Sequence, residues 1–251
     1  MARTIAVTGK GGVGKTTVAA LIIRHLRETS PGPILALDAD PDCNLATVLG
    51  VKVESTIGDL REDMLKQIKD FPPGMSKESY VQAGLHQLIT ETPKVDLITM
   101  GRGEGPGCYC FINNLLRKFA DDLLGAYEWM VMDNEAGLEH LSRRTASFID
   151  HLIVVVNGSP LAIDSAKRID RLLADLGRNV QNKHYVLNAV AEDRAAAAIE
   201  KMSGLSLEYL GTIPRDDAVE EAVREGRSLY TLANTPAVGA IGAMMSKIGV
   251  A

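Results

Sequence analysis

A glycine-rich segment near the N-terminus carries residue types that bind phosphate. It satisfies the spacing G-x-x-x-x-G-K-S/T and consists of Gly9, Lys10, Gly11, Gly12, Val13, Gly14, Lys15, Thr16 and Thr17. Glycines let the backbone fold so that its N–H groups point at the β-phosphate of a nucleotide, and a following helix adds its N-terminal dipole. We expect Lys15 to neutralise the β- and γ-phosphates of ATP and the Thr16 hydroxyl to coordinate Mg²⁺.

Two groups of carboxylates follow apolar runs further along the chain. Asp38 and Asp40 come directly after residues 34–37, and Asp133 comes directly after residues 129–132. A carboxylate at the carboxyl end of a parallel strand faces the ligand crevice of an open α/β sheet. Both groups are therefore candidates for the same nucleotide site, although each alone could be a helix N-cap or a turn residue.

The elements that must position these residues follow from the alternation of short apolar runs with longer helical stretches. This βαβ pattern is typical of a mostly parallel sheet. We expect strands at residues 4–8, 34–37, 97–100, 129–132, 152–156, 185–188 and 207–213, and helices at 15–28, 112–124, 161–176 and 195–202. The sequence thus predicts an α/β fold with an open, mostly parallel twisted sheet flanked by helices, as in P-loop NTPases.

The chain shows no linker composition and no internal repeat, so we expect a single domain over residues 1–251. Residues 51–94 contain a helical pattern and a break at residues 71–74 but no convincing strand. We interpret them as a helical insertion at the rim of the sheet.

The composition and net charge of the chain argue against some classes of binding partner. The chain has 251 residues with 46% hydrophobic and 24% charged side chains, which is typical of a globular protein. Its formal net charge of −5 makes nucleic acid an unlikely ligand, and its longest strongly apolar run, residues 152–156, is far shorter than a membrane span. With no signal-peptide pattern before the glycine loop, we expect a cytoplasmic protein that binds neither nucleic acid nor membrane.

Two of the three cysteines, Cys108 and Cys110, are separated by one residue within a glycine-rich stretch. Two thiols cannot complete the tetrahedral shell of four ligands that Zn²⁺ prefers. Two copies of the pair on the axis of a homodimer could do so, in a geometry suited to Zn²⁺ or to Ni²⁺. The pair could also be two small, partly buried hydrophobic residues or a redox pair, and we interpret the third cysteine, Cys43, as a plain small residue.

The phosphate loop carries an additional lysine, Lys10, besides Lys15. In this it resembles the deviant Walker A ATPases, which include the Min and Par partitioning proteins and the nitrogenase iron protein. The resemblance implies that Lys10 reaches across a homodimer to the partner's nucleotide, that Asp40 orients the attacking water, and that Asp38 supports it near Mg²⁺. It also implies that Asp133 holds Mg²⁺ through water and that the Gly137 amide senses the γ-phosphate. Asn188, at the end of a strand, resembles the adenine-reading asparagine of the family, with Pro214 beside it.

Two further segments resemble a narrower family. Residues 105–110, GPGCYC, with residues 113–117, NNLLR, and residues 133–144, DNEAGLEHLSRR, are similar to the nickel-insertion ATPases of carbon monoxide dehydrogenase maturation, the CooC family. This resemblance implies an ATPase that cycles between ATP and ADP with Mg²⁺. It also implies an intersubunit Ni²⁺ or Zn²⁺ site at Cys108 and Cys110, with carbon monoxide dehydrogenase as client.

Other functions remain open from the sequence. A related protein could mature acetyl-CoA synthase, and a partitioning ATPase is a further alternative. Partitioning proteins that bind membranes usually finish in a basic amphipathic helix, whereas residues 235–251 contain one lysine and predict a packing helix. An electron-transfer ATPase like the nitrogenase iron protein would use well-separated cysteines and not an adjacent pair.

Overall fold

The computed structural model describes residues 2–67, 83–102, 123, 125–135, 148–175 and 180–250. Its centre is a seven-stranded sheet with the order β3-β2-β4-β1-β5-β6-β7, in which all neighbouring strands run parallel. The strands are β1 (Arg3–Gly9), β2 (Ile34–Ala39), β3 (Val95–Thr99), β4 (Trp129–Asn134), β5 (Ile149–Val156), β6 (Val180–Asn188) and β7 (Glu208–Ile213). The predicted open parallel α/β sheet is confirmed.

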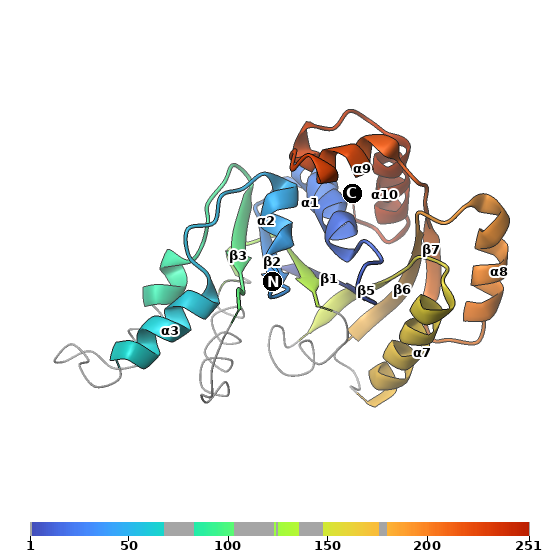
Figure 1. Ribbon diagram of the computed structural model, residues 1–251, viewed down its shortest axis with the longest axis horizontal. Coiled ribbons are helices and arrows are strands. Elements are labelled where there is room, and N and C mark those ends of the chain that lie inside the picture. Colours follow the sequence, from blue (N-terminus) through green and yellow to red (C-terminus); the bar gives the residue numbers. More distant parts are fainter. Residues whose placement is uncertain are drawn as a thin grey trace.

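Helices cover both faces of the sheet (Figure 1). On one side lie α1 (Lys15–Thr29), α2 (Asn44–Leu49), α9 (Asp217–Arg224) and α10 (Pro236–Lys247), with the short 3₁₀ helix η2 (Leu229–Thr231) between the last two. On the other side lie α7 (Pro160–Asp175) and α8 (Glu192–Met202). Within the sheet, β4, β2 and β3 lie between β1 and one edge, whereas β5, β6 and β7 lie between β1 and the other edge. The strand order therefore changes direction at β1, where open α/β sheets bind ligands at their carboxyl edge.

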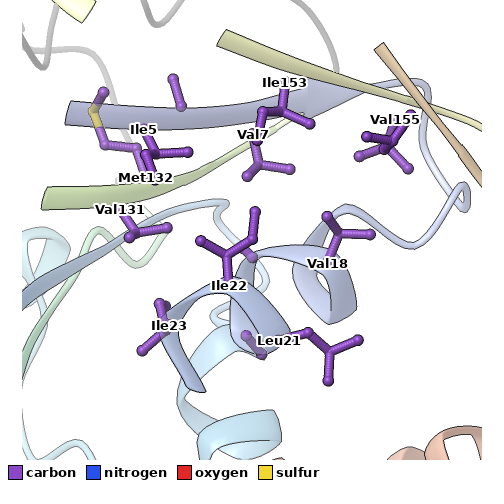
Figure 2. Packing of buried hydrophobic residues seen from close by; sticks show 14 of the residues in the cluster. Ile5, Val7, Val18, Leu21, Ile22, Ile23, Val131, Met132, Ile153 and Val155 are labelled. Atoms are coloured by element: carbon purple, nitrogen blue, oxygen red, sulfur yellow. The ribbon is translucent and has the colours of Figure 1, made fainter. Parts of the chain in front are cut away.

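The strands are continuous apolar runs because they are buried on both faces. Figure 2 shows Val18 and Ile22 of α1 below the central strands, facing Val7 of β1 and its neighbours. Ile22 and Val7 are fully buried, and Val18 is 1% exposed. This packing fixes the first turn of α1 directly under the end of β1, which is what the phosphate loop requires.

Most predicted elements are present, with differences at their ends. The strand expected at residues 97–100 begins two residues earlier as β3, and the one expected at 185–188 begins at Val180 as β6. The helices α2 and α9, which have only 6 and 8 residues, were not predicted from the sequence. The helix expected at 112–124 lies outside the described residues, apart from residue 123.

The described part of residues 51–94 contains α3 (Ile57–Gln67) and a helical stretch at 83–87, next to the edge strand β3. It contacts the sheet through an isolated antiparallel bridge between Thr90 and Leu97 and through the Lys94 carbonyl oxygen, which accepts the N–H of Ile34 in β2 at 2.9 Å. The packing helix predicted near the C-terminus is confirmed as α10, which buries Ala237, Ile241, Met244 and Met245. Among the described residues, no helix is long and apolar enough to span a membrane.

Candidate functional site

The loop from Gly9 to Gly14 has a positive φ, which only glycine adopts without strain, at Gly9, Gly12 and Gly14, and a side chain would also clash at the first and the last of these. Gly9 has φ +150°, and a Cβ there would lie 2.5 Å from the Val155 carbonyl oxygen. Gly14 has φ +90°, and its Cβ would lie 2.3 Å from Nδ2 of Asn188. The loop therefore turns tightly between β1 and α1 because neighbouring strands leave no room for side chains at either end.

The first turn of α1 is arranged to receive an anion. Gly14 is its N-cap and supplies no side-chain acceptor, so the first N–H groups of the helix are available to a ligand. Lys15 is only 7% exposed, which holds its ammonium within the loop. Lys10 is half-buried, and its side-chain ammonium makes no hydrogen bond or ion pair with the described residues. The loop thus concentrates backbone donors and one buried cation at the carboxyl edge of β1.

Two buried carboxylates lie beside the loop in register with each other. Asp38 of β2 pairs directly with Asp133 of β4, and Asp133 pairs with Val7 of β1. Asp38 is fully buried, and its carboxylate accepts hydrogen bonds from the N–H groups of Asp40 at 3.1 Å and Leu45 at 3.0 Å. Burial raises the pKa of Asp38 to about 6, although these two hydrogen bonds favour its charged form.

Asp133 is 1% exposed, and neither of its carboxylate oxygens has a hydrogen-bond partner of normal geometry among the described residues. Burial is the main cause that raises its pKa to about 7, and the charges of Asp38 and Asp40 add to this effect. The Thr16 hydroxyl and the Lys15 ammonium lie close enough to oppose it in part. A buried carboxylate with free oxygens, beside a hydroxyl and a second carboxylate, fits the oxygen-ligand chemistry of Mg²⁺. The donor set therefore suits a magnesium-bound nucleotide.

Asp40 lies in the loop that connects β2 with α2. Its Oδ1 accepts the N–H of Asp42 at 3.0 Å, and its carbonyl oxygen accepts the N–H of Cys43 at 3.1 Å. The side chain is half-buried, so a water molecule can reach it. These two turns hold Asp40 on the same edge of the sheet as Asp38 and Asp133.

A pocket of about 290 Å³ lies on the other side of the phosphate loop, beyond β5. Thr17 and Leu21 of α1 line it, together with Asn188 and Pro214 at the ends of β6 and β7. Val219 of α9 also lines the pocket. The structure therefore brings Asn188 and Pro214 together in one pocket next to the phosphate loop.

Asn188 has a second role that the sequence did not indicate. Its side-chain amide donates a hydrogen bond of 2.8 Å to the carbonyl oxygen of Val13 within the phosphate loop. This bond joins the end of β6 to the loop, so the pocket and the glycine-rich loop share one residue. Only the tertiary contact reveals this role, because 175 residues separate Asn188 from Val13.

Asp216 is a further site residue that sequence reasoning missed. It lines the same pocket, caps α9 and is 8% exposed. The sequence signal that could have identified Asp216 is an aspartate directly before a short amphipathic helix, since aspartate is a typical N-cap residue.

Gly137, Cys108 and Cys110 lie outside the described residues, as does one of the five histidines, His140. Within the described ranges, no group of three or more His, Cys, Asp or Glu side chains could hold a metal ion. The Cys43 thiol contacts the Pro41 carbonyl oxygen at 3.5 Å, and burial is the main cause that raises its pKa. A thiol that stays protonated is a poor metal ligand, which agrees with the interpretation of Cys43 as a plain small residue.

The fold and the loop define a P-loop ATPase. The family model described as the CobQ/CobB/MinD/ParA nucleotide binding domain matches residues 4–229. The chain belongs to this family of ATP-binding and ATP-hydrolysing proteins, whose activity uses a nucleotide with Mg²⁺.

Individual relatives agree with this assignment. The chain is 41% identical to an uncharacterized ATP-binding protein of Methanocaldococcus jannaschii over 230 residues, which cover 91% of this chain and 90% of the relative. It is 30% identical to the carbon monoxide dehydrogenase accessory protein CooC of Rhodospirillum rubrum, over 91% of this chain and 89% of that protein. Among solved structures, septum site-determining protein MinD of Pyrococcus horikoshii, complexed with Mg-ADP, has the same fold. Its TM-score is 0.68 at 22% identity, covering 99% of this chain and 96% of MinD.

Proposed function

We propose that this ATPase works as a nucleotide-dependent homodimer that binds Ni²⁺ or Zn²⁺ through Cys108 and Cys110 and assists nickel insertion into carbon monoxide dehydrogenase. The observation that carries the proposal is the 30% identity to CooC along nine-tenths of both chains. The paired cysteines supply soft ligands of the kind that such a cargo needs. We also propose that residues 1–251 form a single domain with a helical insertion at about residues 51–94.

The chemistry that we propose for each side chain is the role that the resemblance to the deviant Walker A ATPases implies. Lys15 and the N–H groups of α1 bind the phosphates, and Asp40 orients the water that attacks the γ-phosphate. Thr16, with Asp133 acting through water, would hold the Mg²⁺ that neutralises phosphate charge. Lys10 reaches the nucleotide of the partner subunit, Asn188 and Pro214 bind adenine, and the Gly137 amide senses the γ-phosphate.

Contacts at the end of β3 support a link between ATP and metal. The N–H of Met100 donates to the Asp38 carbonyl oxygen at 2.8 Å, and Arg102 pairs with Asp42 at 2.8 Å. Residues 100–102 are thus attached to the loop that carries Asp40, and the chain continues from them toward the cysteine pair at 108 and 110. A change in this loop on ATP hydrolysis would be transmitted to the start of the cysteine segment.

A membrane-bound partitioning role receives no support from α10. A helix that lies on a membrane exposes an apolar face, whereas the apolar residues of α10 are packed against α1 and β7.

The proposal is tested by equilibrium binding of Ni²⁺ and of Zn²⁺, with the oligomer mass measured in parallel, in the presence of ADP, ATP or neither. We expect one ion per dimer in the wild type, no such binding in Cys108→Ala, and ATPase activity largely retained in that variant. Cys43→Ser is the matched control, because it removes a thiol outside the pair.

Unchanged metal affinity in Cys108→Ala would overturn the metal assignment. The client is tested by adding the loaded protein to nickel-free carbon monoxide dehydrogenase and, separately, to nickel-free acetyl-CoA synthase. Activation of acetyl-CoA synthase alone would show that this protein matures acetyl-CoA synthase and not carbon monoxide dehydrogenase.

A further inference from the structure

The Asp216 carboxylate joins two helices at the edge of the nucleoside pocket. Its Oδ1 accepts the N–H groups of Ala218 at 3.2 Å and Val219 at 3.4 Å, which caps α9. Its Oδ2 accepts the N–H of Ala237, in the first turn of α10, at 2.9 Å. The Thr235 hydroxyl also bonds to the carboxylate, and these hydrogen bonds lower the pKa of Asp216 although burial opposes them. The group is therefore an anion that holds the starts of both helices.

The residues attached to Asp216 form part of the pocket wall. Val219 and Ala237 both line the pocket, as does Asp216 itself. A helix of 8 residues such as α9 is not stable alone, so its position depends on its cap and on the packing of Val219 and Ala222. Since α10 packs on α1, the carboxylate connects α9 through α10 to the helix that begins at Lys15.

The hydrolytic groups lie elsewhere. Asp38 and Asp133 lie near the ends of strands on the opposite side of β1, and they do not line this pocket. A change at Asp216 should therefore alter the shape of the nucleoside pocket while the carboxylates near the γ-phosphate keep their positions.

We infer that Asp216 is a positioning residue that sets the affinity for the nucleoside part of the nucleotide and leaves the rate of the chemical step unchanged. The inference rests on the proposal that the pocket beside Asn188 and Pro214 takes the nucleoside.

Two substitutions separate the two functions of the carboxylate. Asp216→Asn keeps an oxygen that can cap α9, because asparagine is a good N-cap, but it turns an N–H₂ group toward the N–H of Ala237. Asp216→Ala removes both the cap and the bond to α10. Asp217→Asn is the matched control, since Asp217 follows directly, its side chain is 96% exposed, and it does not line the pocket.

The experiment measures calorimetric binding of MgADP and of inorganic tripolyphosphate, together with KM and kcat for ATP. We expect Asp216→Ala to bind MgADP about tenfold more weakly, as loss of a hydrogen bond to a charged group implies. Asp216→Asn should be intermediate. In both variants tripolyphosphate affinity should stay at the wild-type value, KM for ATP should rise and kcat should be retained, and Asp217→Asn should match the wild type throughout.

Two results would overturn the inference: unchanged MgADP affinity in folded Asp216→Ala, or an equal loss of MgADP and tripolyphosphate binding. If Asp216→Ala does not fold, Asp216→Asn decides by the same criteria. The proposed nucleoside pocket is tested separately in the wild type, where MgADP should bind more tightly than tripolyphosphate. If the two bind equally, the assignment of the pocket fails independently of Asp216.

Discussion

At the scale of single residues, the main feature is a pair of buried acids whose charge the folded chain compensates only in part. Asp38 and Asp133 occupy paired positions on adjacent strands and have raised pKa values of about 6 and about 7. Buried carboxylates destabilise a protein when they are charged, unless a cation or hydrogen bonds compensate. We interpret this arrangement as a site that is strained without its ligand.

Asp133→Asn should raise the thermal stability of the ligand-free protein at pH 8 and abolish Mg²⁺-dependent ATP hydrolysis. The folded pKa of about 7 lies above the ordinary value of 3.8. The stability that protonated Asp133 contributes is therefore fully present below pH 3.8 and is lost as the pH rises through 7. The variant should gain most over the wild type above pH 7 and little near pH 4, as thermal melts across that range would report.

Asp164→Asn, on the exposed face of α7, is the control for that experiment. An Asp133→Asn protein that melts below the wild type at pH 8 would show that the carboxylate has partners that stabilise its charge.

At the scale of elements, the β1–α1 loop depends on its contact with the end of β6. Gly14 combines a left-handed backbone with close contact to Asn188, whose amide bonds to the Val13 carbonyl oxygen. The loop conformation is therefore fixed by tertiary packing as well as by its own glycines.

Gly14→Ala should destabilise the protein by more than the strain of a left-handed alanine, which is about 1–2 kcal/mol, because it also displaces Asn188. Gly204→Ala is the control: Gly204 has φ +86°, and no atom lies within 4 Å of its added Cβ. We expect the melting temperature to fall further in Gly14→Ala than in Gly204→Ala, with loss of MgADP binding in the former alone. Equal shifts would mean that the Asn188 contact contributes nothing to stability.

The elements that the sequence predicted well are those determined by local pattern. Apolar runs such as that of β5 identify strands buried on both faces, and the loop spacing identified the start of α1 at Lys15. The carboxyl-end rule placed Asp38 and Asp133 on one edge of the sheet. The short helices α2 and α9 escaped prediction because tertiary packing and capping stabilise them more than periodicity does. The hydrogen bond of Asn188 escaped prediction because its partner is distant in the sequence. The hydrogen bond of Asp216 to Ala237 escaped prediction because its partner lies in a neighbouring helix.

At the scale of the whole molecule, the loop that binds phosphate leaves one cation unused. Lys10 is half-buried and has no partner among the described residues, whereas Lys15 is buried within the loop. A nucleotide carried by a second subunit would give Lys10 such a partner, which is the basis of the proposed ATP-dependent dimer.

Lys10→Ala should bind ATP as a monomer but fail to dimerise or hydrolyse it, whereas Lys15→Ala should lose ATP binding itself. Light scattering with and without ATP gives the mass, and calorimetry gives the affinity. Lys52→Ala provides a lysine outside the loop as control. An ATP-bound Lys10→Ala protein that dimerises and hydrolyses ATP normally would exclude the intersubunit role.

The central position of β1 separates the two parts of the proposed site, which are the carboxylates for hydrolysis and the pocket for the nucleoside. Asp38 and Asp133 lie near the ends of strands on one side of it, whereas on the other side Asn188 ends β6 and Pro214 follows β7. Substitutions around β6, β7 and α9 could therefore change which base is accepted while the bond-breaking half keeps its geometry. Engineering a guanine- or analogue-selective version of this ATPase should begin on that side of the sheet.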